Sequence, residues 1–311
     1  MGRFVVRRLV QSAVLVLAVM TLSFFLIRLT PGGPEAALMS NPRASAETLQ
    51  RMRVRFGLDD PLPIQYLKWL RSAAELDFGR SYAYSLPVVD VIAERAWPTF
   101  QLGVLSYAIG LLGVPLGVLA AIKRGQLPDT IIRVLTVVGT SVPSWWLALS
   151  IIVFMSGTVG WFPNGQGNGT PLDWLRHIIL PAVLLSFGGL ITFTRFVRSE
   201  VLEVLNQDYV RTARAKGLDE RIVQRAHVLR NALIPVVTLL GSLLPALLGG
   251  AVITEAIFNW PGMGRLFLEA ASARDYPLLL GMLLLGTVLT IIGTLLADIG
   301  YGLVDPRVRY T

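Results

Sequence analysis

Six long apolar stretches constrain the fold of this chain more than any other feature. They run roughly over 9–27, 100–122, 131–155, 178–196, 232–253 and 278–299. The hydrocarbon core of a bilayer is about 30 Å thick, so a spanning helix needs about 20 mostly apolar residues. Because backbone groups in lipid must be satisfied within the protein, the pattern predicts an all-α integral membrane protein with six transmembrane helices.

The composition supports a membrane protein over a soluble one. Hydrophobic residues make up 53% of the chain and charged residues 15%, about ten points below the usual charged fraction of soluble domains. The formal charge of +8 would suggest a nucleic-acid partner in a soluble chain. Here it is better explained by basic cytoplasmic loops, so we expect membrane lipid and no nucleic acid as partner. The absence of cysteine excludes disulfides and thiolate metal sites.

The distribution of basic residues predicts the orientation. The short loops 157–177 and 254–277 hold few basic residues: Arg176, Arg265 and Arg274. The opposite segments hold many more: Arg3, Arg7, Arg8, Lys123, Arg124, Arg133, Arg198, Arg211, Arg214, Lys216, Arg221, Arg225, Arg230, Arg307 and Arg309. By the positive-inside rule, both termini are predicted to be cytoplasmic. The first apolar run exceeds a typical signal-peptide core, which predicts a retained first helix.

We divide the chain into residues 1–29 (N-terminus and first span), 30–99 (an extracytoplasmic helical insertion) and 100–311 (the core with five spans). Within the insertion, residues 45–56 are predicted to be helical, and after Pro61 and Pro63 an amphipathic helix is expected from Gln65 to Leu76. Its aromatic face should lie on the bundle as a folded cap. Prolines within the spans predict kinks; they are Pro115, Pro143, Pro181, Pro235 and Pro245.

The cytoplasmic loop 199–230 is the most informative polar segment. A short helix is predicted from Tyr209 to Lys216, ended by Gly217, with a second helix starting near Asp219. The first helix carries small residues between basic ones, which suits docking in the groove of a partner. Spacing alone also allows an amphipathic helix resting on anionic lipid.

Several motifs, in order and spacing, resemble the binding-protein-dependent ABC-importer permeases of the dipeptide/oligopeptide/nickel family, first-permease type. They are Arg7–Leu9, Pro31–Pro34, Gly57–Pro61, Gln65–Tyr66, Asp77–Gly79, Ser81, Ser141–Pro143, Trp161–Pro163, Thr212–Leu218 with His227 and Arg230–Pro235, Glu255–Gly264, Arg274–Pro277, Asp298 and Asp305–Arg307. In the general motif of such permeases an acidic residue and an alanine would stand where this chain has Arg211 and Thr212. The version here is similar to the peptide and nickel branch.

The resemblance implies a type I ABC-importer permease fold in a bacterial or archaeal cytoplasmic membrane. It further implies a second homologous permease, two ATPase subunits that bind ATP and Mg, and an extracytoplasmic solute-binding protein or lipoprotein. The predicted cargo is a peptide; dipeptides, longer peptides, nickel chelates and glycosides stay open. A cytoplasmic coupling helix would contact the ATPase through Tyr209, Arg211, Thr212, Ala213, Arg214, Ala215, Lys216, Gly217 and Leu218.

A second candidate site lies in the loop after the fifth span. Its residues are Asn259, Trp260, Pro261, Gly262, Met263 and Gly264. Pro261 and Gly262 favour a tight turn, and we expect Trp260 and Met263 to form an apolar tip. The resemblance places this turn near the mouth of the pathway, where receptor and solute pass. An interfacial aromatic anchor is the alternative.

Catalytic chemistry finds little support. The chain has no Gly-Lys pair and therefore no phosphate-binding loop of the G-x-x-x-x-G-K-[ST] form, so ATP must be hydrolysed by another subunit and no cofactor is expected on this one. His177 and His227 are predicted to lie on opposite sides of the membrane. Glu255 and Asp298 lie near span ends, where solvated or capping roles are common. For Asp298 we favour a structural pairing with cytoplasmic Arg residues over a proton relay. A secondary transporter or channel is the alternative function, and a membrane enzyme a weaker one.

Overall fold

The computed structural model describes residues 2–29, 50, 59–155, 158, 165–167, 169–233, 236 and 251–304. All named elements there are helical, and one isolated antiparallel bridge joins Arg80 and Pro87. The helices are α1 (Gly2–Leu29), α4 (Leu62–Ala74), α5 (Val88–Gly110), α6 (Gly113–Ile122), α7 (Leu127–Ser141), α8 (Ser144–Phe154), α9 (Pro171–Leu205), α10 (Asp208–Ala215), α11 (Glu220–Ile222), the π-helix η3 (Val223–Leu229), α12 (Arg230–Ala232), α14 (Val252–Ile257), α15 (Met263–Ser272) and α16 (Tyr276–Val304). The expected all-α class is confirmed for these residues.

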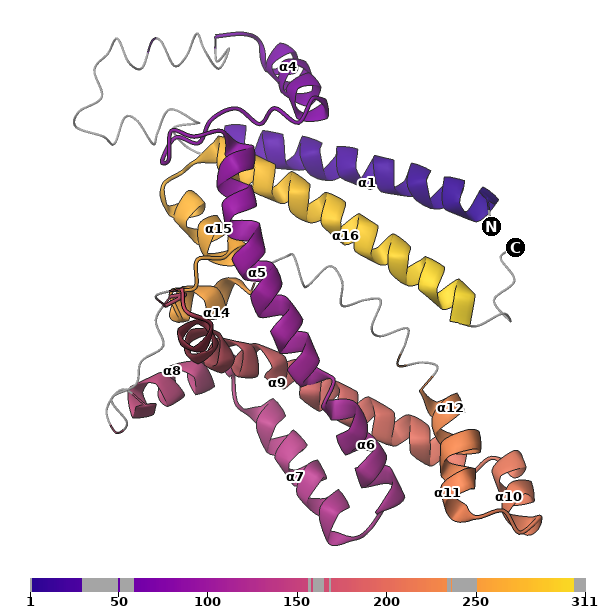
Figure 1. Cartoon of the computed structure of the whole chain (residues 1–311). Coiled ribbons are helices and arrows are strands. Elements are labelled where there is room, and N and C mark those ends of the chain that lie inside the picture. Colours follow the sequence, from indigo (N-terminus) through magenta and orange to yellow (C-terminus); the bar gives the residue numbers. More distant parts are fainter. Residues whose placement is uncertain are drawn as a thin grey trace.

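Helices α1 and α16 lie side by side and run in opposite directions (Figure 1). Helix α4 packs on both of them, through a cluster in which Ala73 meets Met20 and Leu284. The Tyr66 hydroxyl also lies 2.7 Å from Thr21 Oγ1. The predicted aromatic face is confirmed, but α4 begins at Leu62 rather than Gln65. Proline is tolerated in the first turn of a helix, so Pro61 and Pro63 open this helix instead of breaking it.

Helices α5 and α6 follow one another and pack along α9 (Figure 1). The break between them is at Leu111, four residues before Pro115. In a helix the ring of a proline clashes with the carbonyl of the residue four positions earlier, which accounts for a break at this point. The crossing with α9 is very close. A Cβ atom on Gly117 would lie 2.6 Å from the Thr194 carbonyl oxygen, and one on Gly113 would collide with the Leu190 carbonyl. Glycines four residues apart thus let two backbones touch, as in G-x-x-x-G helix pairs.

The third apolar stretch is not the continuous span that was predicted over 131–155. It consists of α7 and α8, which bend by 96° at their junction. Val142 and Pro143 adopt extended backbone between them. Pro143 has no N–H to continue the helix and disfavours helical backbone at the preceding residue. The predicted kink at Pro143 is confirmed in place, and it amounts to a break between two helices.

The other predicted spans have mixed outcomes. By length and composition, residues 88–122, 171–205 and 276–295 form helices able to cross a membrane. The helix expected from residue 100 already begins at Val88, and α9 continues through Pro181. Most of the fifth span, with Pro235 and Pro245, lies outside the described residues, as do the segment 45–56 except residue 50 and the side chain of Asp298. The count of six spans therefore stays a prediction.

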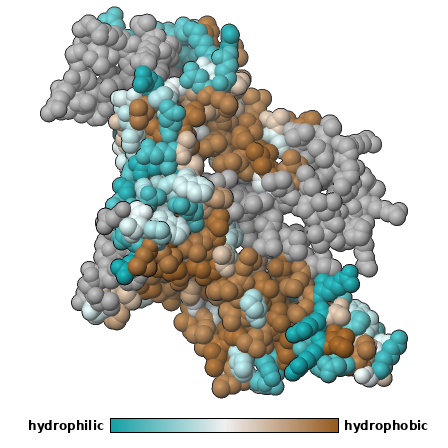
Figure 2. Space-filling view, in the orientation of Figure 1, coloured by the Kyte–Doolittle hydropathy of each residue, from teal (hydrophilic) through white to brown (hydrophobic). Residues whose placement is uncertain are grey.

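The surface has the polarity expected of a chain in a bilayer. Large apolar side chains are exposed along several helices; Leu127, Leu135 and Val153 are examples. Figure 2 shows wide hydrophobic areas on this face, with hydrophilic residues gathered over the α10–α12 end and over α4. Apolar patches of this extent mark contact with lipid or with other apolar chains.

Candidate functional site: the exposed helix α10 and a buried loop

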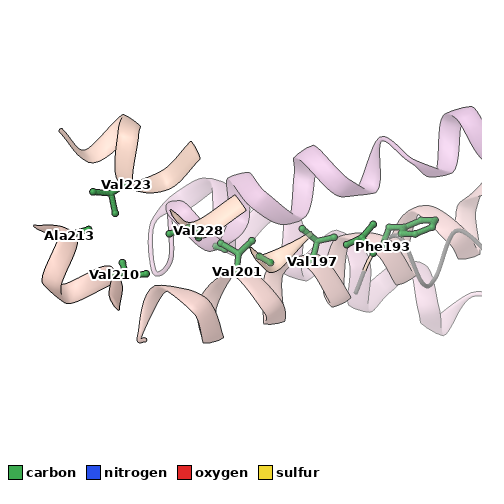
Figure 3. Close-up of a cluster of buried hydrophobic side chains, with 10 residues drawn as sticks. Phe193, Val197, Val201, Val210, Ala213, Val223 and Val228 are labelled. Carbon is green, nitrogen blue, oxygen red and sulfur yellow. The ribbon is translucent and has the colours of Figure 1, made fainter. Parts of the chain in front are cut away.

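The helix predicted from Tyr209 to Lys216 is present as α10. It spans Asp208–Ala215, one residue earlier than expected at each end. Val210 and Ala213 are buried in an apolar cluster formed with α9 and η3, where Val201 and Val223 lie against them (Figure 3). The helix is therefore fixed to the end of α9 by its own apolar face.

The opposite face of α10 is exposed. Arg211, Thr212 and Ala215 lie on that face, and all three are accessible. The other exposed members of the predicted set are Tyr209, Arg214, Lys216, Gly217 and Leu218. Ala213, by contrast, is buried at 5% exposure. The prediction that Ala213 contacts a partner is wrong, because the residue faces the chain's own core.

Gly217 ends the helix as the sequence predicted. Its φ of +76° lies in the left-handed region, which side chains with a Cβ rarely adopt. Its N–H donates to the Arg214 carbonyl over 2.9 Å, and the Leu218 N–H donates to the Ala213 carbonyl over 3.4 Å. These two bonds form a Schellman motif, which satisfies carbonyls at the helix end. The turn directs the chain toward α11.

Arg214 already has a partner within the chain. Its Nε and Nη2 donate to the Glu220 carboxylate over 3.0 and 2.8 Å. The hydrogen bond from Arg214 is the largest cause of a lowered pKa at Glu220. Paired hydrogen bonds between guanidinium and carboxylate fix geometry as well as charge. The pair closes the α10–α11 turn, and sequence spacing gave no signal of it because Gly217 reverses the chain between the two residues.

A π-helix continues the loop. The side chain of Asp219 accepts the Arg221 N–H over 2.8 Å and opens α11, as expected near that position. The predicted second helix is present from Glu220, and its residues 223–229 form the π-helix η3. Asn231 Nδ2 donates to the His227 carbonyl over 2.8 Å and to the Tyr209 hydroxyl over 3.3 Å. Segments of π-helix are rare and often occur at functional sites.

The loop 259–264, called the outer loop after its predicted side of the membrane, is mostly buried, which corrects the expected apolar tip. Trp260 is fully buried, and its indole Nε1–H donates to the Pro98 carbonyl on α5 over 3.0 Å. Met263 is also buried, in the cluster formed with Val88 and Leu278. An interfacial anchor is equally excluded for Trp260. Of the six predicted residues, Asn259 is exposed and has a φ of +52°.

Glu255 organises this loop. Its carboxylate accepts the Thr99 hydroxyl over 2.9 Å and the Arg265 backbone N–H over 3.0 Å, at the first turn of α15. Thr99 Oγ1 in turn accepts the Met263 N–H over 2.7 Å. Together, Glu255 and Thr99 cap a helix whose own N-cap, Gly262, has no side chain. A Cβ on Gly262 would collide with the Glu255 carboxylate. The expected capping role is confirmed, whereas the solvated one is wrong.

Two segments of the family motif meet beside this loop. Asp275, which is fully buried, accepts the Ser81 hydroxyl over 2.5 Å and the Ala83 N–H over 3.0 Å. Tyr84 donates to Glu269 over 2.7 Å, and Glu269 pairs with Arg265. The segment before α5 is thus bound to the start of α16. Sequence reasoning named Ser81 and Asp275 as motif members without foreseeing their contact.

Among the described residues, no group of three or more His, Cys, Asp or Glu side chains is placed to hold a metal ion. The side-chain contacts at the two ends described above instead hold helices to one another. One end of the molecule fixes an exposed basic helix to α9, and the other fixes α5, α14, α15 and α16 to one another.

The fold is that of a helical protein with several helices long and apolar enough to cross a membrane. A chain of the MetNI methionine ABC transporter, from a structure of its inward-facing conformations, shares the fold with a TM-score of 0.54 at 20% identity, over 70% of this chain and 97% of that chain. The chain belongs to the family of binding-protein-dependent transport system inner membrane components, whose profile matches residues 113–310. The profile of the N-terminal part of such membrane components matches residues 1–103.

Curated relatives match over the whole length. The oligopeptide transport system permease protein AppB of Bacillus subtilis is 39% identical over 317 residues, covering 100% of both chains. A putative peptide transport system permease protein of Brucella abortus is 42% identical over 314 residues, again with 100% of both chains covered. The predicted family is confirmed by these matches.

Proposed function

We propose that this chain is a peptide-conducting subunit of an ABC importer, moved by partner ATPases through α10. The observation that carries the proposal is the two-sidedness of α10. Val210 and Ala213 hold the helix to the end of α9, while Arg211, Thr212 and Ala215 are presented outward. A force applied to the outward face would therefore reach α9 directly.

The burial pattern of α10 favours a protein groove over a lipid surface. A helix that lies in the membrane interface buries its apolar face among lipids and turns its basic face to water. In α10 the apolar face is already covered by the chain's own cluster. The outward face has small residues at its centre and Arg211 beside them, so a groove with acidic groups would complement it.

The relatives supply the substrate class and the assembly. Proteins similar to this chain over its whole length are named as peptide and oligopeptide permeases, which supports a peptide as the solute. The family description supports a solute-binding protein as a further partner. We assign ATP and Mg to two ATPase subunits, and the other half of the pathway to a second permease, in a bacterial or archaeal cytoplasmic membrane with both termini inside.

For the outer loop we propose that its buried residues position the neighbouring helices and do not contact the receptor directly. Trp260 and Met263 are buried between helices, so they would hold the outer ends of α5, α14 and α15 in register. Asn259, exposed beside them, is the loop residue best placed to meet the receptor.

Bulk on the outward face of α10 tests the docking proposal. Ala215→Trp should abolish co-purification of the ATPases, because Trp cannot enter a groove shaped for Ala. Ala74→Trp on α4, also at an exposed alanine, is the matched control and should retain them. Full retention of the ATPases by Ala215→Trp, with normal ATP-dependent uptake, would exclude docking through this face.

A further inference from the structure

An ion pair with a buried carboxylate and a partly exposed arginine lies at the end of the molecule that carries α10. Arg198 of α9 donates to Asp129 of α7 through Nε over 2.8 Å and through Nη2 over 3.1 Å. The Gly125 N–H, from the turn between α6 and α7, donates to the same carboxylate over 3.0 Å. Asp129 is 1% exposed. Such a geometry, two-pronged and supported by a backbone donor, is what a buried ion pair needs to persist.

This pair is the contact through which a buried charged side chain of α7 meets α9. The two helices also approach closely at Gly139, where an added Cβ would lie 2.7 Å from Ile191 Cδ1 and 2.9 Å from Phe187 Cε1. Within α7, all of which is described, Asp129 and Thr136 are buried and no large apolar side chain is. Val134, Leu135, Val137 and Val138 all lie exposed. Helices usually attach through an apolar stripe, so an attachment through a charged clamp is unusual. An aspartate in the first turn already suits the helix dipole and needs no arginine from another helix for that purpose.

The arginine of the pair lies within the platform that holds α10. Val197 and Val201, on either side of Arg198 along α9, belong to the apolar cluster that buries Val210 and Ala213 (Figure 3). Any displacement of α10 that moves this part of α9 therefore moves Arg198. Through Asp129 and Gly125 it also moves the start of α7 and the turn before it.

We propose that Asp129 and Arg198 are positioning residues that carry the motion of α10 to α7, and that their contact stays closed throughout the transport cycle. This inference rests on the proposed function, since it needs α10 to be driven by an ATPase. Helix α7 leads through the 96° bend into α8, whose Ala148 packs against Leu184 and Phe258. The clamp would thus move one arm of the bent pair while the other arm stays packed at the outer end.

The test uses the complete importer in proteoliposomes, with labelled peptide uptake and ATP hydrolysis measured together. Arg198→Gln should keep assembly and ATP hydrolysis but lower the peptide moved per ATP about tenfold, within the range of typical couplings between sites. Asp129→Asn should lower the peptide moved per ATP to a similar extent. The double variant should show no larger loss than either single variant, because both substitutions remove the same contact.

Arg133→Gln is the matched control. Arg133 lies 3.4 Å from the same carboxylate, but it is 53% exposed and belongs to α7 itself, so it cannot link α7 to α9. Its peptide-to-ATP ratio should match the wild type. Equal losses in Arg133→Gln and Arg198→Gln, or a normal ratio in Arg198→Gln, would overturn the inference. Absence of uptake by the wild-type complex would instead contradict the proposed function.

A second measurement keeps Asp129 and Arg198 intact, so it tests the inference even if the substituted complexes fail to assemble. The chain has no cysteine, so spin labels can be placed at the exposed Thr130 and Glu203 through Thr130→Cys and Glu203→Cys. The label separation should change by less than about 2 Å between ATP-free and ATP-bound complexes, the scale of small helix shifts. A larger change would show that the clamp opens, and the inference would be wrong.

Discussion

Thr99 on α5 donates a hydrogen bond of 2.9 Å to the buried carboxylate of Glu255 on α14 and accepts the Met263 N–H over 2.7 Å. One hydroxyl therefore connects three helices at the outer end. Thr99→Val keeps the shape but leaves a buried carboxylate oxygen and an N–H without this partner. It should lower the unfolding free energy by about 1–3 kcal/mol, seen as a lower thermal midpoint in detergent. Thr99→Ser should lose much less, and equal losses would contradict the hydrogen-bond account.

The crossing of α6 with α9 depends on glycine. At Gly117 an added Cβ would lie 2.6 Å from the Thr194 carbonyl oxygen and 2.9 Å from Val197 Cβ. Gly117→Ala should therefore destabilise the chain by about 1–3 kcal/mol through overpacking. Gly188→Ala is the control, because a Cβ there meets nothing within 4 Å and alanine favours a helix by up to about 1 kcal/mol. Opposite shifts in the thermal midpoint are expected; a drop in both would refute the close-contact account.

Gly217 is needed for its backbone angle and not for space. Its φ is +76°, and no atom lies within 4 Å of an added Cβ. Gly217→Val should weaken the α10–α11 turn by more than the cost of about 1 kcal/mol expected for Gly217→Ala. Gly217→Asn should be milder, since asparagine tolerates this region. The rate of protease cleavage within 216–220 should be highest for Gly217→Val, lower for Gly217→Ala and lowest for Gly217→Asn. The reverse order would indicate that contacts, and not φ, select glycine.

The Arg214–Glu220 pair predicts a pH dependence. Its hydrogen bonds lower the pKa of Glu220 in the folded chain, so the pair stabilises above the unfolded value of about 4.3 and is lost as pH falls through the folded value. The side chains are 41% and 51% exposed, so the contribution is about 0.2–1 kcal/mol. The thermal midpoint of the wild type should exceed that of Glu220→Gln at pH 7. This gap should close below about pH 4, whereas a constant gap would contradict the ion-pair origin.

Sequence patterns predicted most helices because apolar runs and turn residues are local signals. Gly217 and the bounds of α10 follow from such signals, and the face of Tyr66 and Trp69 follows from helical spacing. The 96° bend after Ser141 was not predictable in size, since a proline fixes where a helix stops but not where the next one points. The close approach at Gly113 and Gly117 had a readable signal, the G-x-x-x-G spacing, which we did not use.

The contacts that build the two ends were beyond sequence reasoning. Glu255 and Thr99 lie 156 residues apart, and Asp129 and Arg198 lie 69 apart. A single sequence does not say which distant polar groups share a buried site. The same limit explains the misplaced apolar tip. Tryptophan is a common residue type in exposed interfacial anchors. Here Trp260 is buried, and its indole N–H donates to the Pro98 carbonyl on α5, a partner that the local sequence does not reveal.

The most direct test of the account is uphill uptake of a labelled peptide into proteoliposomes. The complete importer, with its ATPases and receptor, should accumulate peptide when ATP is supplied and should not do so with a non-hydrolysable analogue. This chain reconstituted alone should accumulate none. Accumulation against a gradient by the isolated chain would contradict the claim that it is a conduit moved through α10 by other subunits.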